Sequence, residues 1–435
     1  MSTPAANTPI ASTRREPAGA TWSGCHTFAA RELLVPGTVE QLQEVIASSP
    51  RVRALGTRHS FNDVADTDGS LVSVLGLPER FELDPILGTV TVSGGTSYGR
   101  LAEQLGPTRW ALANMGSLPH ISVAGAVSTG THGSGTHHRN LSAAVRAIET
   151  VAADGELRRW AREDDPDFGG RVLSLGALGV TTSLTLDLVP SYEVRQDVWF
   201  DLPWEVLLDH VDEIMTSAYS VSIMPDWRSS ERAGKVWLKS RTDSWDGSLD
   251  PARYGARWAN SSAGKLAEGQ FPHQTVQGGV PGPWWQRLPH FRPDTSPSRG
   301  DEIQSEYFVD RRHSADALAA LRACAERFAH LVLVSELRTV AADDLWLSPA
   351  QGRDSLGIHF TWANDAEAVL EVLPIVEAAL APFSPRPHWG KWFTLEGTAV
   401  REHYPRLSTF HRLAELADPS GKFRNSFLKR TLGLV

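Results

Sequence analysis

The sequence is poor in cysteine, in long apolar runs and in clustered basic residues. Its 435 residues include two cysteines, Cys25 and Cys324, which argues against a disulfide-framed secreted domain and favours a reducing, cytoplasmic location. No run of about 18 apolar residues occurs, so we expect no membrane partner. The net charge is -9, and no lysine and arginine cluster could follow a phosphate backbone, so nucleic acid is not an expected partner either.

The length and the changing composition predict two domains, because 435 residues exceed what one hydrophobic core usually organises. Helix and strand signals alternate up to about residue 193. Beyond it tryptophans become dense, and residues 242–300 are rich in Gly, Ser, Pro and Gln. We expect residues 1–18 to be a disordered tail, because Arg14-Arg15 is followed by Glu16 and not by the apolar stretch of an export signal.

Local patterns predict several elements. Thr38-Val39-Glu40-Gln41 has the capping-box form, which predicts a helix over residues 38–48. A second helix should begin near Tyr98, and Asp154-Gly155 predicts a hairpin. Alternating or apolar runs predict strands at 52–56, 71–74, 89–92, 180–188, 331–340 and 357–362, and a late helix is expected over 366–380, disturbed by Pro374.

Two loops are rich in small residues. Gly56-Thr57-Arg58-His59-Ser60 follows a predicted strand, where successive backbone N–H groups can converge on a pyrophosphate. Residues 116–135 contain almost no bulky polar side chains, so the backbone can approach a flat cofactor closely. The glycine spacing matches neither the dinucleotide fingerprint nor the phosphate loop. His132, His137 and His138 lie close in sequence, but without cysteines or a His-Glu-x-x-His helix we expect no metal site.

Charged residues in the second half stand in apolar surroundings. The period of a strand places Glu336 and Arg338 on one face, and His359 and Thr361 on one face of the next strand. The pair Glu336 and Arg338 could be a structural ion pair. Lys391 lies between Trp389 and Trp392, which is unusual for a solvated lysine and favours a desolvated functional amine.

These segments together resemble the vanillyl-alcohol-oxidase flavoproteins. Residues 53–62, 116–135 and 175–180 look like the FAD-binding domain of that family, and residues 335–339, 358–362 and 388–391 look like the substrate segments of bacterial alditol oxidases. The resemblance extends over about residues 20–430. It implies an α+β, two-domain fold: a FAD-binding domain of the PCMH type at 19–193, a cap domain with an antiparallel sheet at 194–400, and a segment at 401–435 that returns to the FAD domain.

The resemblance also implies cofactor and substrate contacts. The cofactor would be FAD, joined covalently through its 8α carbon to His59. Its other contacts would come from Leu55, Gly56, Thr57, Arg58, Ser60, Ser117, Ser122, Gly125, Val127, Gly130, Thr131, His132, Gly133, Ser134, Val180 and His388. Ser122, Glu336, Arg338, Thr361 and Lys391 would contact a small polyol.

The implied reaction oxidises the primary hydroxyl of an alditol, such as xylitol or sorbitol, to an aldose and reduces O2 to H2O2. Our hypothesis is that Lys391, with His359, removes the hydroxyl proton, that Arg338 stabilises negative charge, and that Glu336 and Thr361 hold neighbouring hydroxyls. Which group is the base stays open.

Three other functions fit the same residues. The scaffold could serve an aldonolactone (gulono- or galactono-1,4-lactone) oxidase or dehydrogenase, a non-catalytic flavin-bearing sensor, or a tryptophan-rich carbohydrate-binding protein. We expect a monomer or a small oligomer.

Overall fold

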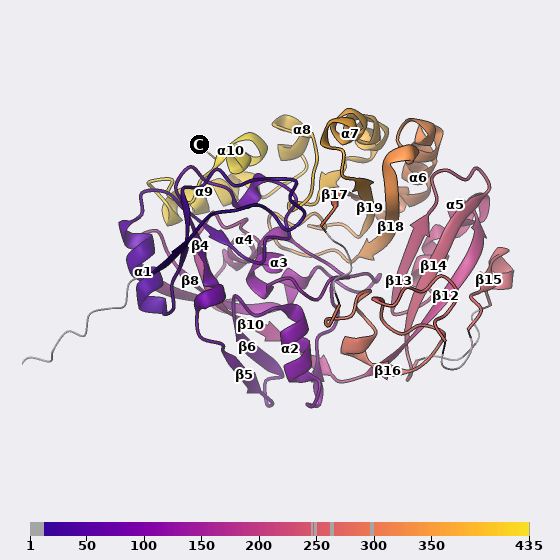
Figure 1. Cartoon of the computed structure of the whole chain (residues 1–435), viewed down its shortest axis with the longest axis horizontal. Helices are drawn as coiled ribbons and strands as arrows, with labels where there is room; N and C mark the ends of the chain where they lie inside the picture. Colours follow the sequence, from indigo (N-terminus) through magenta and orange to yellow (C-terminus); the bar gives the residue numbers. More distant parts are fainter. Residues whose placement is uncertain (1–12, 245–246, 248–249, 262–264, 296–299, 435) are drawn as a thin grey trace, which may run out of the picture.

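The computed structural model describes residues 13–244, 247, 250–261, 265–295 and 300–434. Figure 1 shows two sheet-containing regions side by side, with the early part of the chain in one and most of the residues after 190 in the other. The predicted helix at 38–48 is confirmed as α1 (Val39–Ser48), and the Thr38 side chain accepts from the Gln41 N–H as the capping box requires. The expected α+β class is confirmed.

The first sheet has the order β1-β2-β4-β3. Its strands are β1 (Arg14–Glu16), β2 (Glu32–Val35), β3 (Val52–Leu55) and β4 (Ser70–Ser73). The expected disorder of residues 1–18 is wrong for its second part, because Arg14–Glu16 pairs antiparallel with β2 and Ala18 is buried beside Phe28. Residues 1–12 of that expectation lie outside the described residues.

The second sheet is antiparallel with the order β5-β6-β10-β8-β9. Its strands are β5 (Phe81–Asp84), β6 (Thr89–Ser93), β8 (Val145–Val151), β9 (Leu157–Ala161) and β10 (Val180–Asp187). The hairpin predicted at Asp154-Gly155 is confirmed, since β8 pairs with β9. Around these sheets lie α2 (Tyr98–Leu105), α3 (Val123–Thr129), α4 (Phe168–Val172) and the small pair β7 (Trp110–Ala111) with β11 (Val189–Pro190).

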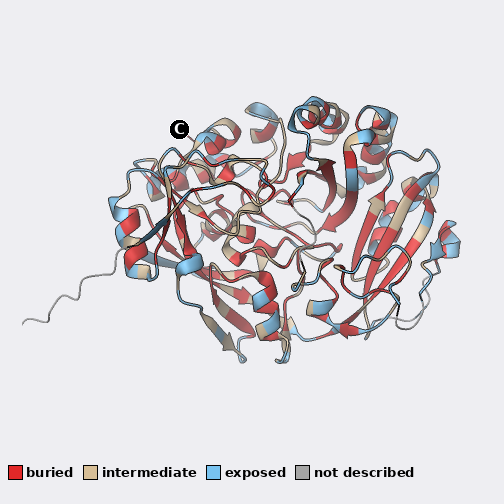
Figure 2. Ribbon diagram, in the orientation of Figure 1, coloured by how far each residue is buried: buried red, intermediate tan, exposed pale blue. Residues whose placement is uncertain are grey.

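The third sheet has nine strands and is antiparallel, with the order β15-β12-β14-β13-β18-β19-β17-β20 and β16 beside β12. Its strands are β12 (Glu193–Pro203), β13 (Ser220–Pro225), β14 (Arg232–Arg241), β15 (Arg257–Trp258), β16 (Gly282–Pro283), β17 (Glu302–Asp310), β18 (Val332–Val340), β19 (Ser355–Ala363) and β20 (Arg386–Pro387). Apolar side chains of this sheet pack with those of α5 (Trp204–Thr216), α6 (Ser314–Ala323) and α7 (Ala366–Leu380) in one core. Figure 2 shows its central strands largely buried.

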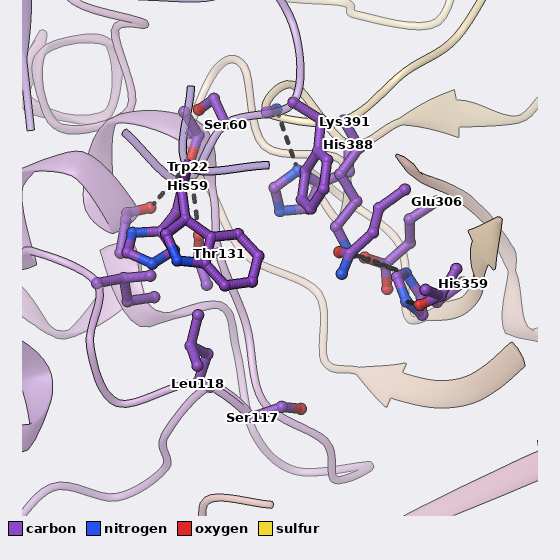
Figure 3. A pocket seen from close by; sticks show the side chains of 18 of the residues that line it. Trp22, His59, Ser60, Ser117, Leu118, Thr131, Glu306, His359, His388 and Lys391 are labelled. Carbon is purple, nitrogen blue, oxygen red and sulfur yellow. Dashed lines mark hydrogen bonds and ion pairs between the residues drawn. The ribbon is translucent and has the colours of Figure 1, made fainter. Parts of the chain in front are cut away.

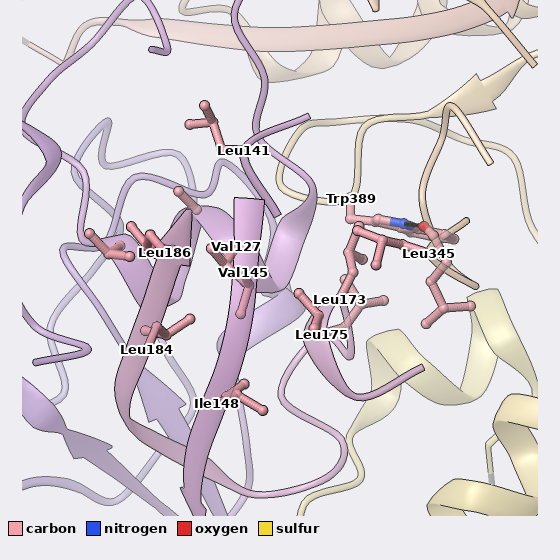
Figure 4. Close-up of a cluster of buried hydrophobic side chains, with 14 of the residues drawn as sticks. Val127, Leu141, Val145, Ile148, Leu173, Leu175, Leu184, Leu186, Leu345 and Trp389 are labelled. Carbon is pink, nitrogen blue, oxygen red and sulfur yellow. Dashed lines mark hydrogen bonds between the residues drawn. The ribbon is translucent and has the colours of Figure 1, made fainter. Parts of the chain in front are cut away.

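The chain returns to the first region at its end. The last helices are α8 (Thr398–Arg401), α9 (Leu407–Ala417) and α10 (Ser426–Leu432), and their apolar residues share a core with α3, β8 and β10. Leu345 and Trp389, from segments expected in the cap, also enter this core (Figure 4). We propose a division into a FAD-binding domain and a cap domain. Two segments of the cap, around Leu345 and Trp389, pack on the core of the first region.

No helix in the described part of the chain has both the length and the apolar character needed to cross a bilayer.

Candidate functional site

A cavity of about 800 Å³ lies where the first region meets the nine-stranded sheet. One wall comes from the loop after β3, the residues around α3 and part of the 116–132 segment. The other wall comes from β13, β14, β17, β18, β19 and residues 388–391. Figure 3 shows Trp22 and His59 on one side of this space, and Glu306, His359 and Lys391 on the other. The two loops and the two strands singled out in the sequence therefore meet in one place.

The loop after β3 lies very close to the start of α3. A Cβ atom added to Gly56 would lie 2.6 Å from Ser122 Oγ, and one added to Gly125 would lie 2.8 Å from the same oxygen. The Ser122 N–H donates to Thr57 Oγ1 at 3.2 Å. Arg58 has φ 65, a conformation uncommon outside glycine. This crossing leaves no room for side chains at Gly56 and Gly125, and it presents backbone to the cavity.

His59 is partly buried, beside an aromatic ring that the sequence reasoning missed. The ring of Trp22 stacks on that of His59, with centroids 5.3 Å apart and planes at 27°. Burial, with a smaller effect of His120, lowers the pKa of His59 to about 4, so its imidazole is neutral at neutral pH. His59 Nδ1 is buried and has no hydrogen-bond partner among the described residues. Such an atom is costly unless something else satisfies it.

The expected cofactor contacts divide into two groups. Leu55, Gly56, Thr57, Arg58, His59, Ser60, Ser117, Ser122, Gly125, Thr131, His132 and His388 line the cavity. The structure does not bring Val127, Gly130, Gly133, Ser134 and Val180 to its wall. Val127 and Val180 pack in hydrophobic cores, and Gly130 ends α3 with φ 73. A Cβ on Gly133 would meet Asn114, and the Ser134 hydroxyl donates to the Val221 carbonyl.

The polar wall follows the strand period. In the pairing of β18 with β19, Glu336 stands opposite His359, and His359 in turn stands opposite Glu306 of β17. His359 and Thr361 share a face, with His359 Nε2 and Thr361 Oγ1 2.9 Å apart. On the opposite face, Phe360 and Trp362 stack at 4.9 Å. The alternation predicted for this strand is therefore confirmed.

Glu306 is the centre of the polar wall, and the sequence reasoning missed it. Its Oε1 accepts from Arg338 at 2.8 Å and from His132 at 3.1 Å, and its Oε2 accepts from Lys391 at 2.6 Å. The side chain is fully buried. Burial alone would raise the pKa of Glu306. Arg338, Lys391 and His132 together lower it by more than burial raises it, so the pKa lies well below its usual value. The available sequence signal for Glu306 was its position directly before the apolar residues Tyr307-Phe308-Val309.

Lys391 is desolvated and lies against His359 and Glu306. Its Nζ lies 2.9 Å from His359 Nδ1, besides the contact with Glu306. Trp389 Nε1 donates to the Leu347 carbonyl and Trp392 Nε1 donates to the Phe61 carbonyl, so the flanking indoles are held elsewhere. Burial lowers the pKa of Lys391, and Glu306 opposes this effect.

Glu336 and Arg338 lie next to each other but form no hydrogen bond with each other. Arg338 Nε and Glu336 Oε2 are 3.7 Å apart, too far for a hydrogen bond. The Nη2 nitrogen of Arg338 donates to Glu306 Oε1, and its Nη1 nitrogen donates to Ser117 Oγ at 3.4 Å. Arg338 Nε and Glu336 Oε1 are both buried without a hydrogen-bond partner among the described residues. Both residues line the cavity, so each has hydrogen-bonding capacity left beside it.

A second group of buried nitrogens lies behind Glu336. His290 Nε2 is 3.5 Å from Glu336 Oε1, and burial lowers the pKa of His290 well below its usual value. Lys239 is fully buried and donates to the Leu288 carbonyl; burial lowers its pKa to about 7, with Glu336 opposing. Neither residue carries a motif, so sequence alone gave no signal for them.

No group of three or more His, Cys, Asp or Glu side chains that could hold a metal is found in the described ranges. His132, His137 and His138 separate: His132 contacts Glu306, and His138 lies against Tyr219.

Comparisons with known proteins agree with this geometry. Two family profiles match, one described as FAD binding domain over residues 30–161 and one described as D-arabinono-1,4-lactone oxidase over residues 297–431. An alditol oxidase of a Streptomyces species is 46% identical over 414 residues, covering 94% of this chain and 98% of that protein. The L-gulono-1,4-lactone dehydrogenase of Mycobacterium tuberculosis is 28% identical, covering 96% and 99%.

The fold itself is shared with more distant structures. Cholesterol oxidase from B. sterolicum is 13% identical and superposes with a TM-score of 0.76 over 98% of both chains. The fold and the FAD-binding match define a flavoprotein oxidoreductase of the vanillyl-alcohol-oxidase type. Within that class the chain belongs to the alditol oxidase family.

Proposed function

We propose that this protein oxidises the primary hydroxyl of an alditol, such as xylitol or sorbitol, to an aldose, with O2 reduced to H2O2. The observation that carries the proposal is that Glu336 and Arg338 line the same cavity as His59. A hydroxyl both donates and accepts, so a substrate hydroxyl can donate to the carboxylate of Glu336 and accept from the guanidinium of Arg338. Thr361, Lys391 and Ser122 line the same cavity and offer further contacts to a polyhydroxylated chain.

The cavity residues fit a tethered FAD. The close crossing of Gly56 with Ser122 brings backbone to a flat ligand, and Ser60, Ser117, Thr131, His132 and His388 line the same space. His59 has a neutral imidazole and an unpartnered Nδ1, so one of its nitrogens is free to form a covalent bond to the 8α carbon. When bound, FAD supplies the two-electron acceptor, and O2 restores its oxidised form.

The protein's own groups would hold and move the hydroxyl proton. Lys391 donates to His359 Nδ1, which leaves the proton of that neutral ring on Nε2, directed at Thr361. Burial lowers the pKa of Lys391, which favours its neutral amine, and that amine accepts the substrate proton. Arg338 then stabilises the negative charge that develops on the substrate oxygen. A positioned proton acceptor of this kind contributes about 100-fold or more to a rate.

The alternative is oxidation of an aldonolactone. The chain matches the D-arabinono-1,4-lactone oxidase profile and a gulonolactone dehydrogenase, and both matches support this alternative. The higher identity to an alditol oxidase favours alditols.

The experiment is anaerobic mixing of the purified yellow protein with xylitol, sorbitol or L-gulono-1,4-lactone, followed by loss of flavin absorbance. Alditols should reduce the flavin faster, and readmitted oxygen should yield H2O2. Thr361→Val is a matched variant, since it keeps the shape and removes one hydroxyl contact; its affinity for xylitol should fall. A tenfold preference for the lactone would move the assignment to the lactone branch, and absence of reduction by any of them would favour a non-catalytic flavoprotein.

A further inference from the structure

The charges at one end of the cavity balance. Glu306 and Glu336 carry negative charge, and Arg338 and Lys391 carry positive charge. Arg338 contacts both carboxylates, at 2.8 Å and 3.7 Å, and Lys391 contacts Glu306 at 2.6 Å. Burial lowers the pKa of the neighbouring imidazoles of His132, His359 and His388, which disfavours their charged forms. The set of four therefore has no net charge.

We propose that Glu306 is a positioning residue that makes this end of the site electrically neutral and thereby selects uncharged polyols over carboxylates. The inference rests on the proposed function, because it concerns which substrates enter that same site. Nothing in the known motifs or in the comparisons assigns a role to Glu306.

Glu306 acts through other residues. Both of its oxygens are taken by donors, Oε1 by Arg338 and His132 and Oε2 by Lys391, and its side chain has no exposed surface. A substrate hydroxyl would therefore meet the guanidinium of Arg338 and the amine of Lys391, each aimed by Glu306. His132 comes from the first region and Glu306 from the nine-stranded sheet, so the contact also fixes the two walls relative to each other.

Removing the charge of Glu306 leaves one positive charge in excess at this end. A small carboxylate would then find two cations opposed only by Glu336, in a buried place where charge interactions are strong. Lys235 also lines the cavity, but it lies on β14, in the row of the sheet that continues through Met224 and Glu336. That position is four strand spacings from Glu306, roughly 19 Å, and two from Glu336, roughly 10 Å; Glu336 opposes the lowering of the Lys235 pKa by burial. Its charge, and that of Lys239 on the same strand, is common to all the variants compared.

The test measures binding of glycolate, a carboxylate short enough to probe one end of the cavity. Holoenzyme is titrated with glycolate under anaerobic conditions, and the perturbation of flavin absorbance is measured before any bleaching of the flavin by oxidation of the glycolate hydroxyl. Glu306→Gln should bind glycolate at least about tenfold more tightly than the wild type, while its reduction by xylitol slows. Glu306→Asp, which keeps the charge, should bind glycolate as the wild type does. Glu306→Gln combined with Lys391→Met restores neutrality and should lose the gain.

Three outcomes would overturn the proposal: no gain in glycolate affinity in Glu306→Gln, an equal gain in Glu306→Asp, or a gain that survives in the double variant. If Glu306→Gln alone does not fold, the double variant is compared with Lys391→Met, which has one negative charge in excess and should bind glycolate more weakly. Because glycolate binding needs no turnover, its result is separate from the proposed function, which the wild-type reaction with xylitol tests.

Discussion

The ammonium of Lys391 lies 2.6 Å from Oε2 of Glu306, a carboxylate on β17. A lysine with a solely structural role at this position would neutralise a buried carboxylate such as Glu336. The carboxylate that Lys391 meets is Glu306. This contact decides how a substitution at Lys391 should behave.

Lys391→Met should slow flavin reduction by xylitol by about 100-fold or more, because a positioned proton carrier is lost. Its effect on the melting temperature should be moderate, since Glu306 keeps Arg338 and His132 as partners. Stopped-flow reduction and a thermal melt, run on the same preparations, check both parts. Near-normal reduction with a collapsed melting temperature would leave Lys391 a structural role only.

Lys239 should make stability depend on pH above neutrality. Its pKa is about 7 in the folded protein and 10.5 when solvated, because burial disfavours the charged form. Between these values the unfolded chain binds more protons than the folded one, so stability rises with pH in this window. Relative to Lys239→Met, the wild type should gain about 1 kcal/mol per pH unit from pH 7.5 to 9.5. Thermal melts of both proteins measure this difference, and a difference independent of pH would contradict the pKa.

Most of the fold that could be predicted was predicted from local sequence signals. The capping box at Thr38, the turn at Asp154-Gly155 and the alternation around His359 each act within a few residues, so the sequence contains all that determines them. The face shared by Glu336 and Arg338 likewise follows from the strand period.

Pairing between distant segments could not be read from the sequence. Glu306 joins the site only because β17 pairs with β19 in one register, and a shift by one residue would turn its side chain to the other face. Arg14–Glu16 forms a strand because it pairs with the edge of β2. Trp22 reaches His59 through the same N-terminal segment, whose backbone bonds to the 58–61 loop.

Acid denaturation should leave the flavin with the protein pellet if His59 carries it. His59→Ala should give folded protein with little or loosely held FAD, since the His59 ring makes an aromatic contact but its Nδ1 makes no hydrogen bond. His137→Ala is a suitable control, because that side chain is exposed and does not line the cavity. Flavin released wholly into the supernatant from the wild type would refute the covalent link, as would full acid-stable loading in His59→Ala.

Trp22→Ala should weaken the attachment of FAD without abolishing its binding. The indole covers one face of His59 at 5.3 Å, and the Trp22 backbone N–H donates to the Arg58 carbonyl at 2.8 Å, which holds the ring there. Removing the indole lets the imidazole rotate and admits water, so the nitrogen spends less time in a reactive orientation. A stacked aromatic pair contributes about 1 kcal/mol, so attachment should slow roughly three- to tenfold. Trp22→Phe keeps a ring in place and should attach FAD at a rate close to the wild type. The measurement is the fraction of acid-stable flavin after apoprotein is mixed with FAD for increasing times, and equal rates in all three proteins would show that Trp22 has no part in placing His59.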